Sequence, residues 1–240
     1  MPTRQQFLTF NYRATNFLPS IRGKQELRQI GLFCGTFNPI HMGHLIIAEC
    51  ARDQFKLDKV LFVTSPTPPH RADQLLDGNF RYEMVQSATA ENPHFVPSAI
   101  ELERVGPSYT IDTVKEVRTI YGEDIKINLI IGGDNLPHLH TWKNFEELLS
   151  LCRVLVVPRL RYIDESDKAL RMVGEESTDT NIGFDNADIV LVDFPGIAVS
   201  GSNIRERIRA GKTVLYMVPP AVNELIEKRG YFKTQSASAK

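Results

Sequence analysis

The segment GTFNPIHMGH, residues 35–44, separates an apolar run typical of a buried strand, Ile30–Cys34, from a helical pattern, Gly43–Phe55. Its leading glycine lets a ligand approach the backbone closely, and His41 and His44 fall at the positive N-terminus of the helix. Strand-to-helix turns of this kind bind anions in α/β proteins. The segment therefore predicts a site for a nucleotide phosphate, and with it an α/β fold.

The two histidines are open to three interpretations. A histidine at a helix start can serve only as a cap or lie at the surface, and a pair of them can ligate zinc. A structural zinc site uses about four ligands, and no cysteine, aspartate or third histidine lies nearby in the sequence at ligand spacing. Neutral imidazoles donate hydrogen bonds, and protonated ones neutralise the charge that builds on a phosphate in a transition state. The phosphate role is therefore favoured.

Length and charge limit the classes of function. The 240 residues suffice for one sizeable core, and we expect a single domain at residues 30–232. The formal net charge is −1 with both signs evenly scattered, which argues against nucleic acid and membrane partners and favours a small-molecule substrate. Residues 1–29 carry a basic bias, for which a flexible extension is favoured over an organelle transit segment. Residues 233–240 are expected to form a tail.

The cysteine pattern bears on the cellular compartment. Cys34, Cys50 and Cys152 are odd in number, lie in apolar stretches and lack CxxC spacing. They are typical of reduced core residues in an intracellular protein. No apolar run approaches the ~20 residues of a membrane helix, and the N-terminus lacks the apolar core of a secretory signal. We therefore expect a soluble, cytoplasmic protein.

From Ile30 onward, short apolar runs alternate with helical patterns. This alternation predicts a doubly wound parallel sheet covered by helices on both faces, with a small helical part at the C-terminal end. The expected strands are Ile30–Cys34, Val60–Thr64, Phe95–Pro97, Ile127–Ile131, Val154–Val157 and Ile189–Val192. The expected helices are Gly43–Phe55, Phe80–Glu91, Thr110–Tyr121, Trp142–Leu149, Lys168–Val173, Ser202–Ala210 and Ala221–Lys228.

Polar segments follow several of the expected strands, at the sheet edge where ligands of such folds bind. Asp134, after two glycines, can accept hydrogen bonds from two ribose hydroxyls, or it can simply cap a short helix. Residues 200–205 open a helix with two serines, and Arg205 adds a fixed cation one turn in. Capping alone explains Ser200 or Ser202 but not Arg205. Two anion-binding helix starts suit a substrate with several phosphates.

A known superfamily shares these features. The turn is similar to the (T/S)-x-(D/N)-P-(I/V)-H-x-G-H signature of the HxGH nucleotidylyltransferases, which is fitted by Thr36, Asn38, Pro39, His41, Gly43 and His44. Further segments between about Gly31 and Phe232 resemble one of its branches, the nicotinate (or nicotinamide) mononucleotide adenylyltransferases. They are Pro69-His70-Arg71, Arg81-x-x-Met84, Ser108-Tyr109-Thr110-x-Asp112-Thr113, Gly133-Asp134, Trp142, Ser200 to Arg205 and Val218-Pro219 to Tyr231.

The resemblance implies a Rossmann-like α/β fold and adenylyl transfer from ATP to nicotinate mononucleotide, which yields deamido-NAD and pyrophosphate without a covalent enzyme intermediate. It also implies Mg²⁺ as the companion of ATP, with no metal ligand among the protein side chains. By the same resemblance, the expected catalytic residues are His41, His44 and Arg205. ATP is expected to contact Gly35, Thr36, Phe37, Ser202 and Asp134. The pyridine nucleotide is expected to contact Tyr109, Thr110, Trp142, Lys143, Asn38 and Arg71.

Four positions depart from the commonest bacterial pattern of that branch. Cys34 replaces a glycine, Asn38 an aspartate, Arg71 a lysine and Gly201 a serine. Arg71 keeps the charge but changes its geometry. The loss of a hydroxyl at position 201 leaves the backbone N–H groups of the helix start intact.

Several alternatives stay open at this point. The acceptor could be nicotinamide mononucleotide as well as the acid, or phosphopantetheine, and a nucleotide sensor without turnover is a more distant reading. Trp142 could be a core or helix-start residue, and Thr110 and Asp112 could serve only as helix caps. The sequence does not decide whether the chain forms a homo-oligomer.

Overall fold

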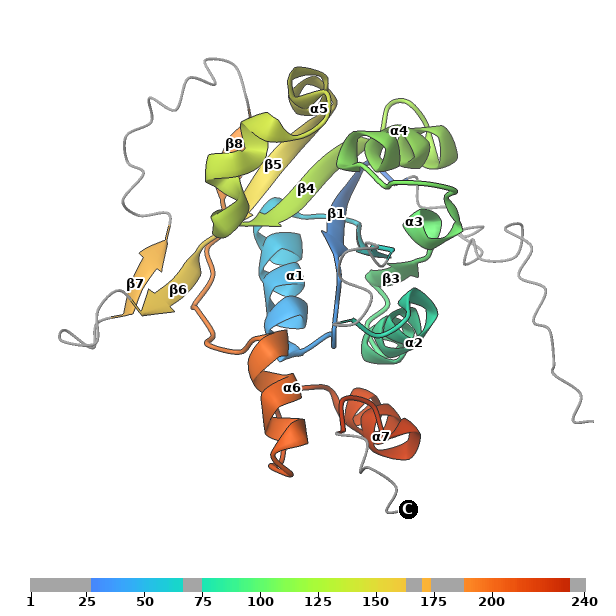
Figure 1. Ribbon diagram of the computed structural model, residues 1–240. Coiled ribbons are helices and arrows are strands. Elements are labelled where there is room, and N and C mark those ends of the chain that lie inside the picture. The colour runs from blue at the N-terminus through green and yellow to red at the C-terminus, as the bar shows by residue number, and fades with distance from the viewer. Residues whose placement is uncertain (1–26, 67–74, 163–169, 174–187, 234–240) are drawn as a thin grey trace, which may run out of the picture.

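The computed structural model describes residues 27–66, 75–162, 170–173 and 188–233. Its main strands are β1 (Gln29–Gly35), β2 (Lys59–Thr64), β3 (Phe95–Ser98), β4 (Lys126–Gly132), β5 (Cys152–Val157) and β8 (Ile189–Leu191). They form one parallel sheet in the order β3-β2-β1-β4-β5-β8 (Figure 1). The order runs outward from β1 in both directions, so the doubly wound sheet predicted from the sequence is confirmed.

Helices cover both faces of this sheet. They are α1 (Met42–Phe55), α2 (Gly78–Thr89), α3 (Ile100–Glu103), α4 (Thr110–Tyr121), the 3₁₀ helix η2 (Gly133–Thr141), α5 (Phe145–Leu151), α6 (Gly201–Arg209) and α7 (Pro220–Arg229). One apolar cluster contains residues of α1, α2, α6 and α7, and a second contains residues of α4, η2 and α5. In Figure 1, α6 and α7 lie together below α1 and α2. They are the helical part that the sequence predicts at the C-terminal end.

The central strands are largely apolar because both of their faces are buried, although β4 carries the buried Asn128. In β1, Leu32 belongs to the cluster under α4 and α5, and the next residue, Phe33, belongs to the cluster under α1. In β2, Leu61 and Phe62 divide in the same way. Successive side chains of a strand point to opposite faces, so a continuous apolar run fills both layers. The prediction of a buried parallel sheet depended on such runs.

One expected helix is wrong. The sequence pattern predicted a helix at Lys168–Val173, but residues 170–173 form the strand β7 (Leu170–Val173). This strand pairs antiparallel with β6 (Arg159–Tyr162), which the sequence analysis did not predict. An element of four residues is too short to show the apolar periodicity of a helix or of a strand. Its conformation is decided by pairing with the neighbouring strand.

The expected helix Trp142–Leu149 begins later than predicted. Trp142 ends η2, where its N–H donates to the carbonyl of Leu139 at 3.1 Å, and α5 starts only at Phe145. Asn144 between them adopts a left-handed conformation with φ 50°. This residue interrupts the helical path, and asparagine tolerates that conformation better than most residues. The short helices η2 and α3 were not predicted either.

One buried cation joins three loops at the carboxyl edge of the sheet. The side chain of Arg81, in α2, is fully buried, and its guanidinium donates to the backbone carbonyls of Thr36, Ser65 and Leu76. The first two residues follow β1 and β2, and the third precedes α2. Burial lowers the pKa of Arg81, but a guanidinium keeps its charge at neutral pH. This cation therefore stays fully charged and is held by backbone dipoles.

Within the part of the chain that the structure describes, no helix combines the length and the apolar character needed to cross a membrane.

We predict that Arg81→Met strongly destabilises the protein. Methionine keeps much of the side-chain length but removes every donor, so carbonyls in three loops lose their partner. A buried polar group without a partner costs about 1–3 kcal/mol. We therefore expect the free energy of unfolding, measured with urea, to fall by at least about 3 kcal/mol.

The matched control is Arg229→Met. Arg229 of α7 pairs with Glu83 of α2 at 3.0 Å, and both side chains are substantially exposed. Exposed ion pairs contribute at most about 1 kcal/mol, so this variant should stay close to the parent protein. An Arg81 variant no less stable than the control would show that the buried cation does not hold the loops.

Candidate active site

The two histidines of the first turn meet at the start of α1. His41 is buried and occupies the N-cap position with extended backbone angles. Its backbone N–H donates to Nδ1 of His44 at 3.2 Å, and the two imidazole rings stack with centroids 3.7 Å apart. Because Nδ1 of His44 accepts this hydrogen bond, the proton of the neutral ring lies on Nε2. The turn therefore fixes both the orientation and the tautomer of His44.

Gly43 makes room for this ring pair. A Cβ atom at Gly43 would lie 3.1 Å from the ring of His41 and 3.2 Å from the side chain of Ile197. Both distances are tighter than most side-chain contacts, so an added Cβ would require the His41 ring or the Ile197 side chain to shift. The glycine between the two histidines therefore leaves space for the stacked rings.

The first-turn N–H groups of α1 are largely engaged within the protein. The N–H of Met42 donates to the carbonyl of Met217 at 2.9 Å, and those of His44 and Leu45 donate to the carbonyl of His41. Three of the early donors of the helix are thus already used. What this turn can offer a ligand comes mainly from the imidazoles and from the helix dipole.

Zinc binding by the pair is disfavoured by geometry. An imidazole binds zinc in its ring plane at about 2 Å. The rings of His41 and His44 are stacked, and their planes are inclined by only 26°. The two planes therefore intersect too far from the ring nitrogens for one zinc ion to bind both. Among the described residues, no group of three or more His, Cys, Asp or Glu side chains is placed to hold a metal ion.

The rest of the turn is shaped by its own side chains. Phe37 adopts φ 45°, is buried, and packs edge-on against His44 with ring centroids 5.1 Å apart. A Cβ at Gly35 would lie 2.9 Å from the Phe37 ring, so this glycine also makes space. The buried Asn38 accepts a hydrogen bond from the N–H of Leu76 through Oδ1. The side chains of Phe37 and Asn38 therefore build the turn, a role that sequence reasoning missed.

The start of α6 packs directly against this turn. Arg205 donates from Nη1 to the carbonyl of Asn38 at 2.7 Å and from Nη2 to the hydroxyl of Ser202 at 3.2 Å. A Cβ at Gly201 would lie 3.0 Å from the same Asn38 carbonyl oxygen. Ser200 is the N-cap and accepts from the N–H of Asn203. The structure therefore brings the two helix starts together and places the Arg205 cation between them.

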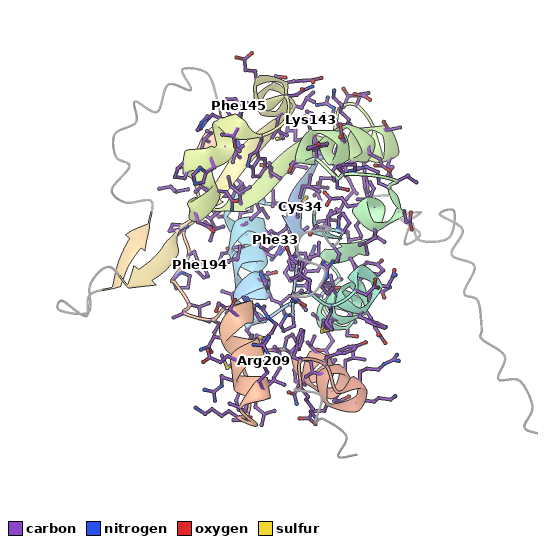
Figure 2. All side chains as sticks on the ribbon, viewed as in Figure 1. Phe33, Cys34, Lys143, Phe145, Phe194 and Arg209 are labelled. Atoms are coloured by element: carbon purple, nitrogen blue, oxygen red, sulfur yellow. The ribbon has the colours of Figure 1, made fainter. Side chains whose placement is uncertain are left out.

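A second group of expected residues gathers where α4 meets the link between η2 and α5. Tyr109 is the N-cap of α4 and makes no side-chain cap bond, and Thr110 is the first helical residue. The ammonium of Lys143 lies 4.4 Å from the centre of the Tyr109 ring and 3.0 Å from the carboxylate of Asp112. Lys143 lies at the end of the molecule formed by α4 and α5 (Figure 2). Because Tyr109 is the N-cap of α4, the interpretation of Thr110 as the cap is wrong. The carboxylate of Asp112 has Lys143 as its side-chain partner.

Two further expectations concern single residues. Trp142 is half-buried and packs against the cluster under α4 and α5, so its core interpretation is partly confirmed. Asp134 lies in η2, whose N-cap is Gly132, so the interpretation of Asp134 as that cap is wrong. Arg71 lies outside the described residues, as does the rest of the Pro69-His70-Arg71 segment in the loop after β2.

A buried carboxyl group supports the segment around Tyr109. Glu101 of α3 is buried and accepts from the hydroxyl of Thr113 at 2.7 Å, and Arg104 donates to that same hydroxyl at 3.0 Å. Burial raises the pKa of Glu101 above its ordinary value. Sequence reasoning missed Glu101, because nothing in its local pattern marks a glutamate as buried.

The cysteines are free thiols, as the sequence predicts. Burial, followed by the neighbouring Glu101, raises the pKa of the Cys34 thiol well above its usual range. Burial also raises the pKa of Cys50, and that of Cys152 to about 12. The cysteine that replaces a glycine next to the turn is therefore a protonated, unreactive thiol.

The chain matches known nucleotidyltransferases along most of its length. Residues 32–207 match the cytidylyltransferase-like family. A relative from Moorella thermoacetica named as a nicotinate-nucleotide adenylyltransferase is 39% identical over 210 residues, which cover 85% of this chain and 92% of the relative. One of the same name from Thermus thermophilus is 36% identical over 206 residues, covering 85% of this chain and 100% of the relative.

A solved structure agrees with the fold. The Plasmodium falciparum nicotinic acid mononucleotide adenylyltransferase complexed with NaAD superposes with a TM-score of 0.65 at 15% sequence identity. The match covers 85% of this chain and 97% of that one. At this level of identity the likeness concerns the fold, and the Rossmann-like architecture expected from the sequence is confirmed.

We predict that Glu101→Gln changes how stability depends on pH. Because the native pKa of Glu101 is raised, the unfolded chain releases this proton first, and the native state loses stability as pH rises from about 4.3, the ordinary value for Glu, through the raised native value. The variant carries no such proton. We expect the free energy of unfolding of the variant, measured with urea at several pH values, to increase relative to that of the parent protein as pH rises through this window.

Glu147→Gln serves as a control of opposite sign. Hydrogen bonds from Lys115 and Asn144 lower the pKa of Glu147, so its contribution to stability is present above the ordinary Glu pKa and is lost as pH falls. The free energy of unfolding of this variant should therefore decrease relative to that of the parent protein as pH rises. Parallel curves for the Glu101 variant and the parent would contradict the buried-carboxyl interpretation.

Proposed function

The chain belongs to the nicotinate-nucleotide adenylyltransferase family, and we propose that it transfers the adenylyl group of ATP to nicotinate mononucleotide, giving deamido-NAD and pyrophosphate. The observation that supports this most is the packing of two helix starts, α1 and α6, against one turn. It gathers the imidazoles of His41 and His44 and the guanidinium of Arg205, which together suit several phosphates.

The reaction mainly needs two polyanions to be held in line. A phosphate oxygen of the mononucleotide attacks the α-phosphorus of ATP, the bond to the β-phosphate oxygen breaks, and pyrophosphate leaves. Positioning and charge neutralisation suffice, so no residue acts as a nucleophile. We assign His41, His44 and Arg205 to phosphate binding at this centre, with backbone contacts from Gly35, Thr36 and Phe37 and the Ser202 hydroxyl as further ligands of ATP.

His44 suits its assigned role because its tautomer is set. Nδ1 accepts from the backbone of His41, so Nε2 carries the proton that a phosphate oxygen can accept. A proton on Nδ1 would face the N–H of His41, so the ring acts on the transferring phosphate as a hydrogen-bond donor through Nε2. The ring of Phe37 packs against His44 and restricts its movement.

Magnesium fits this site as part of the ATP complex. The described donors at the turn are imidazole and guanidinium groups, whereas Mg²⁺ prefers oxygen ligands, so phosphate oxygens and water would hold the ion. When bound, it supplies charge neutralisation on the triphosphate. The protein groups add positive charge on the other phosphate oxygens.

We assign the other expected residues to the acceptor side. Tyr109, Thr110 and Lys143 lie together and, with Trp142 next to Lys143 in the sequence, would form the subsite for the pyridine ring, whereas Asp134 would contact ATP through a ribose hydroxyl. The earlier proposals that Asn38 and Arg71 contact the pyridine nucleotide stay predictions; the Asn38 amide is engaged with the loop before α2. The cytoplasmic location also stays a prediction.

The direct test measures pyrophosphate release from ATP and magnesium with separate acceptors. We expect release with nicotinate mononucleotide to exceed that with nicotinamide mononucleotide, and no release with phosphopantetheine. Comparable rates with the first two would replace acid specificity by dual specificity. Release with neither would overturn the proposed function, and binding of ATP without release would point to a sensor.

We predict that His44→Asn and His44→Ala both lower kcat by a factor on the order of 10²–10³, the usual effect of removing a group that stabilises transition-state charge. Asparagine has a carbonyl oxygen that can accept from the N–H of His41, so it keeps the turn while removing Nε2. Urea unfolding should show the asparagine variant close to the parent. Near-normal turnover in the asparagine variant would leave His44 only the structural role of accepting from the N–H of His41 at the helix start.

A further inference from the structure

An open groove of about 480 Å³ lies between α1, the end of α2 and the start of β3. Its lining residues are Leu45, Ile46, Glu49, Ala88, Glu91, Asn92, Pro93 and Phe95. None of them is among the residues assigned above to either substrate. The groove is therefore a surface feature that the proposed reaction does not use.

One part of the lining is apolar and keeps some exposed surface. Leu45, Ile46 and Ala88 are partly buried and pack against the apolar cluster under α1, and Phe95 belongs to that cluster. An apolar side chain placed in the groove would remove the remaining exposed surface of these residues from water. This part of the lining therefore favours aromatic or aliphatic side chains.

The polar part of the lining is acidic. Glu91 is exposed just after α2. Glu49 accepts hydrogen bonds from Arg52 and from Asn92, and the bond from Arg52 lowers the pKa of its carboxyl, so the group is ionised at neutral pH. The described residues that line the groove include no lysine or arginine. The groove therefore disfavours phosphate-bearing ligands and favours cations.

The N-terminal part of the chain joins the fold close to this groove. The N–H groups of Arg28 and Gln29 donate to the carboxylate of Asp58 at 2.8 Å and 2.9 Å, which fixes the start of β1. The carbonyl oxygen of Asp58 lies 3.1 Å from Nδ1 of His94, the residue after Pro93 of the groove. One strand separates β1 from β3 in the sheet, so their starts lie about 10 Å apart. Residues 1–26 span up to about 85 Å when extended, which is enough to reach the whole groove.

Residues 1–26 lie outside the described residues, but their composition is complementary to the groove. Their aromatic residues are Phe7, Phe10, Tyr12 and Phe17. Their basic residues are Arg4, Arg13, Arg22 and Lys24, against Glu26 as the one acidic residue. The match to the cytidylyltransferase-like family begins at residue 32, so this segment lies before the part that the chain shares with that family.

We propose that residues 8–13 dock into the groove of the same chain. Phe10 and Tyr12 contact the apolar part of the lining, and Arg13 lies beside Glu91. Residues 8–13 have the sequence LTFNYR, in which apolar and polar residues alternate. In an extended chain this alternation places the apolar side chains on one face and leaves the polar ones for the acidic residues and the solvent.

The experiment is methyl NMR on the full chain. We expect nuclear Overhauser contacts from the rings of Phe10 and Tyr12 to the methyl groups of Leu45 and Ile46. The double variant Phe10→Ser/Tyr12→Ser should lose these contacts and shift both sets of methyl resonances, because an aromatic ring changes the magnetic field at groups packed against it. Phe17→Ser is the matched control. It removes a ring from the same segment but outside the alternating residues, and it should leave the methyl resonances unchanged.

Charge reversal tests the second contact. Glu91→Lys and Arg13→Glu should each weaken docking about threefold to fivefold, measured as movement of the methyl resonances toward those of the double-serine variant. The two changes combined should restore docking, because opposite charges again face each other. Glu224→Lys reverses an exposed charge in α7, outside the groove, and should leave docking unchanged.

Two results would overturn the inference. Methyl resonances of Leu45 and Ile46 that are the same in the parent protein and in the double-serine variant would leave residues 1–26 without contact to the groove. Contacts that disappear when isotope-labelled chains are diluted in an excess of unlabelled chains would place the segment in the groove of a second copy instead. Neither result bears on adenylyl transfer, which the release of pyrophosphate tests separately.

Discussion

The buried guanidinium of Arg81 is the contact on which the arrangement of the site depends. It holds the turn after β1, the end of β2 and the approach to α2 through three carbonyls. Two further bonds extend this chain of contacts: Asn38 accepts from the N–H of Leu76, and Arg205 donates to the carbonyl of Asn38. Loops that belong to different βα units are thus linked by backbone carbonyls and cations. A buried charge is tolerated here because its donors are satisfied.

Three glycines of the site act through their small volume. A Cβ at Gly35 would meet the Phe37 ring, one at Gly43 would meet the His41 ring, and one at Gly201 would meet the carbonyl of Asn38. Each glycine therefore marks a place where two parts of the site come so close that an added Cβ would require its neighbour to move. The stacked histidines and the contact between α6 and the turn both depend on such close approaches.

The sequence predicted the parts of the fold that local pattern controls. The central strands were found because continuous apolar runs are needed where both faces are buried, and α1 was found because its start carries a recognisable turn. The strand β7 was predicted as a helix, since four residues carry too little periodicity and their conformation depends on pairing with β6. The roles of Arg81 and Glu101 could not be read locally. Arg81 contacts Thr36, 45 positions away, and such a partner is decided by the tertiary fold.

The raised pKa values of the three cysteines have a practical consequence. The thiolate is the nucleophile in reactions with maleimides and iodoacetamide, and burial keeps Cys34 and Cys152 in the thiol form at neutral pH. A cysteine introduced at an exposed position, with an ordinary pKa, would then react far faster than the native ones. Cys34 and Cys152 therefore compete little for a fluorophore or spin label placed at such a position, and the residue beside Gly35 stays unmodified.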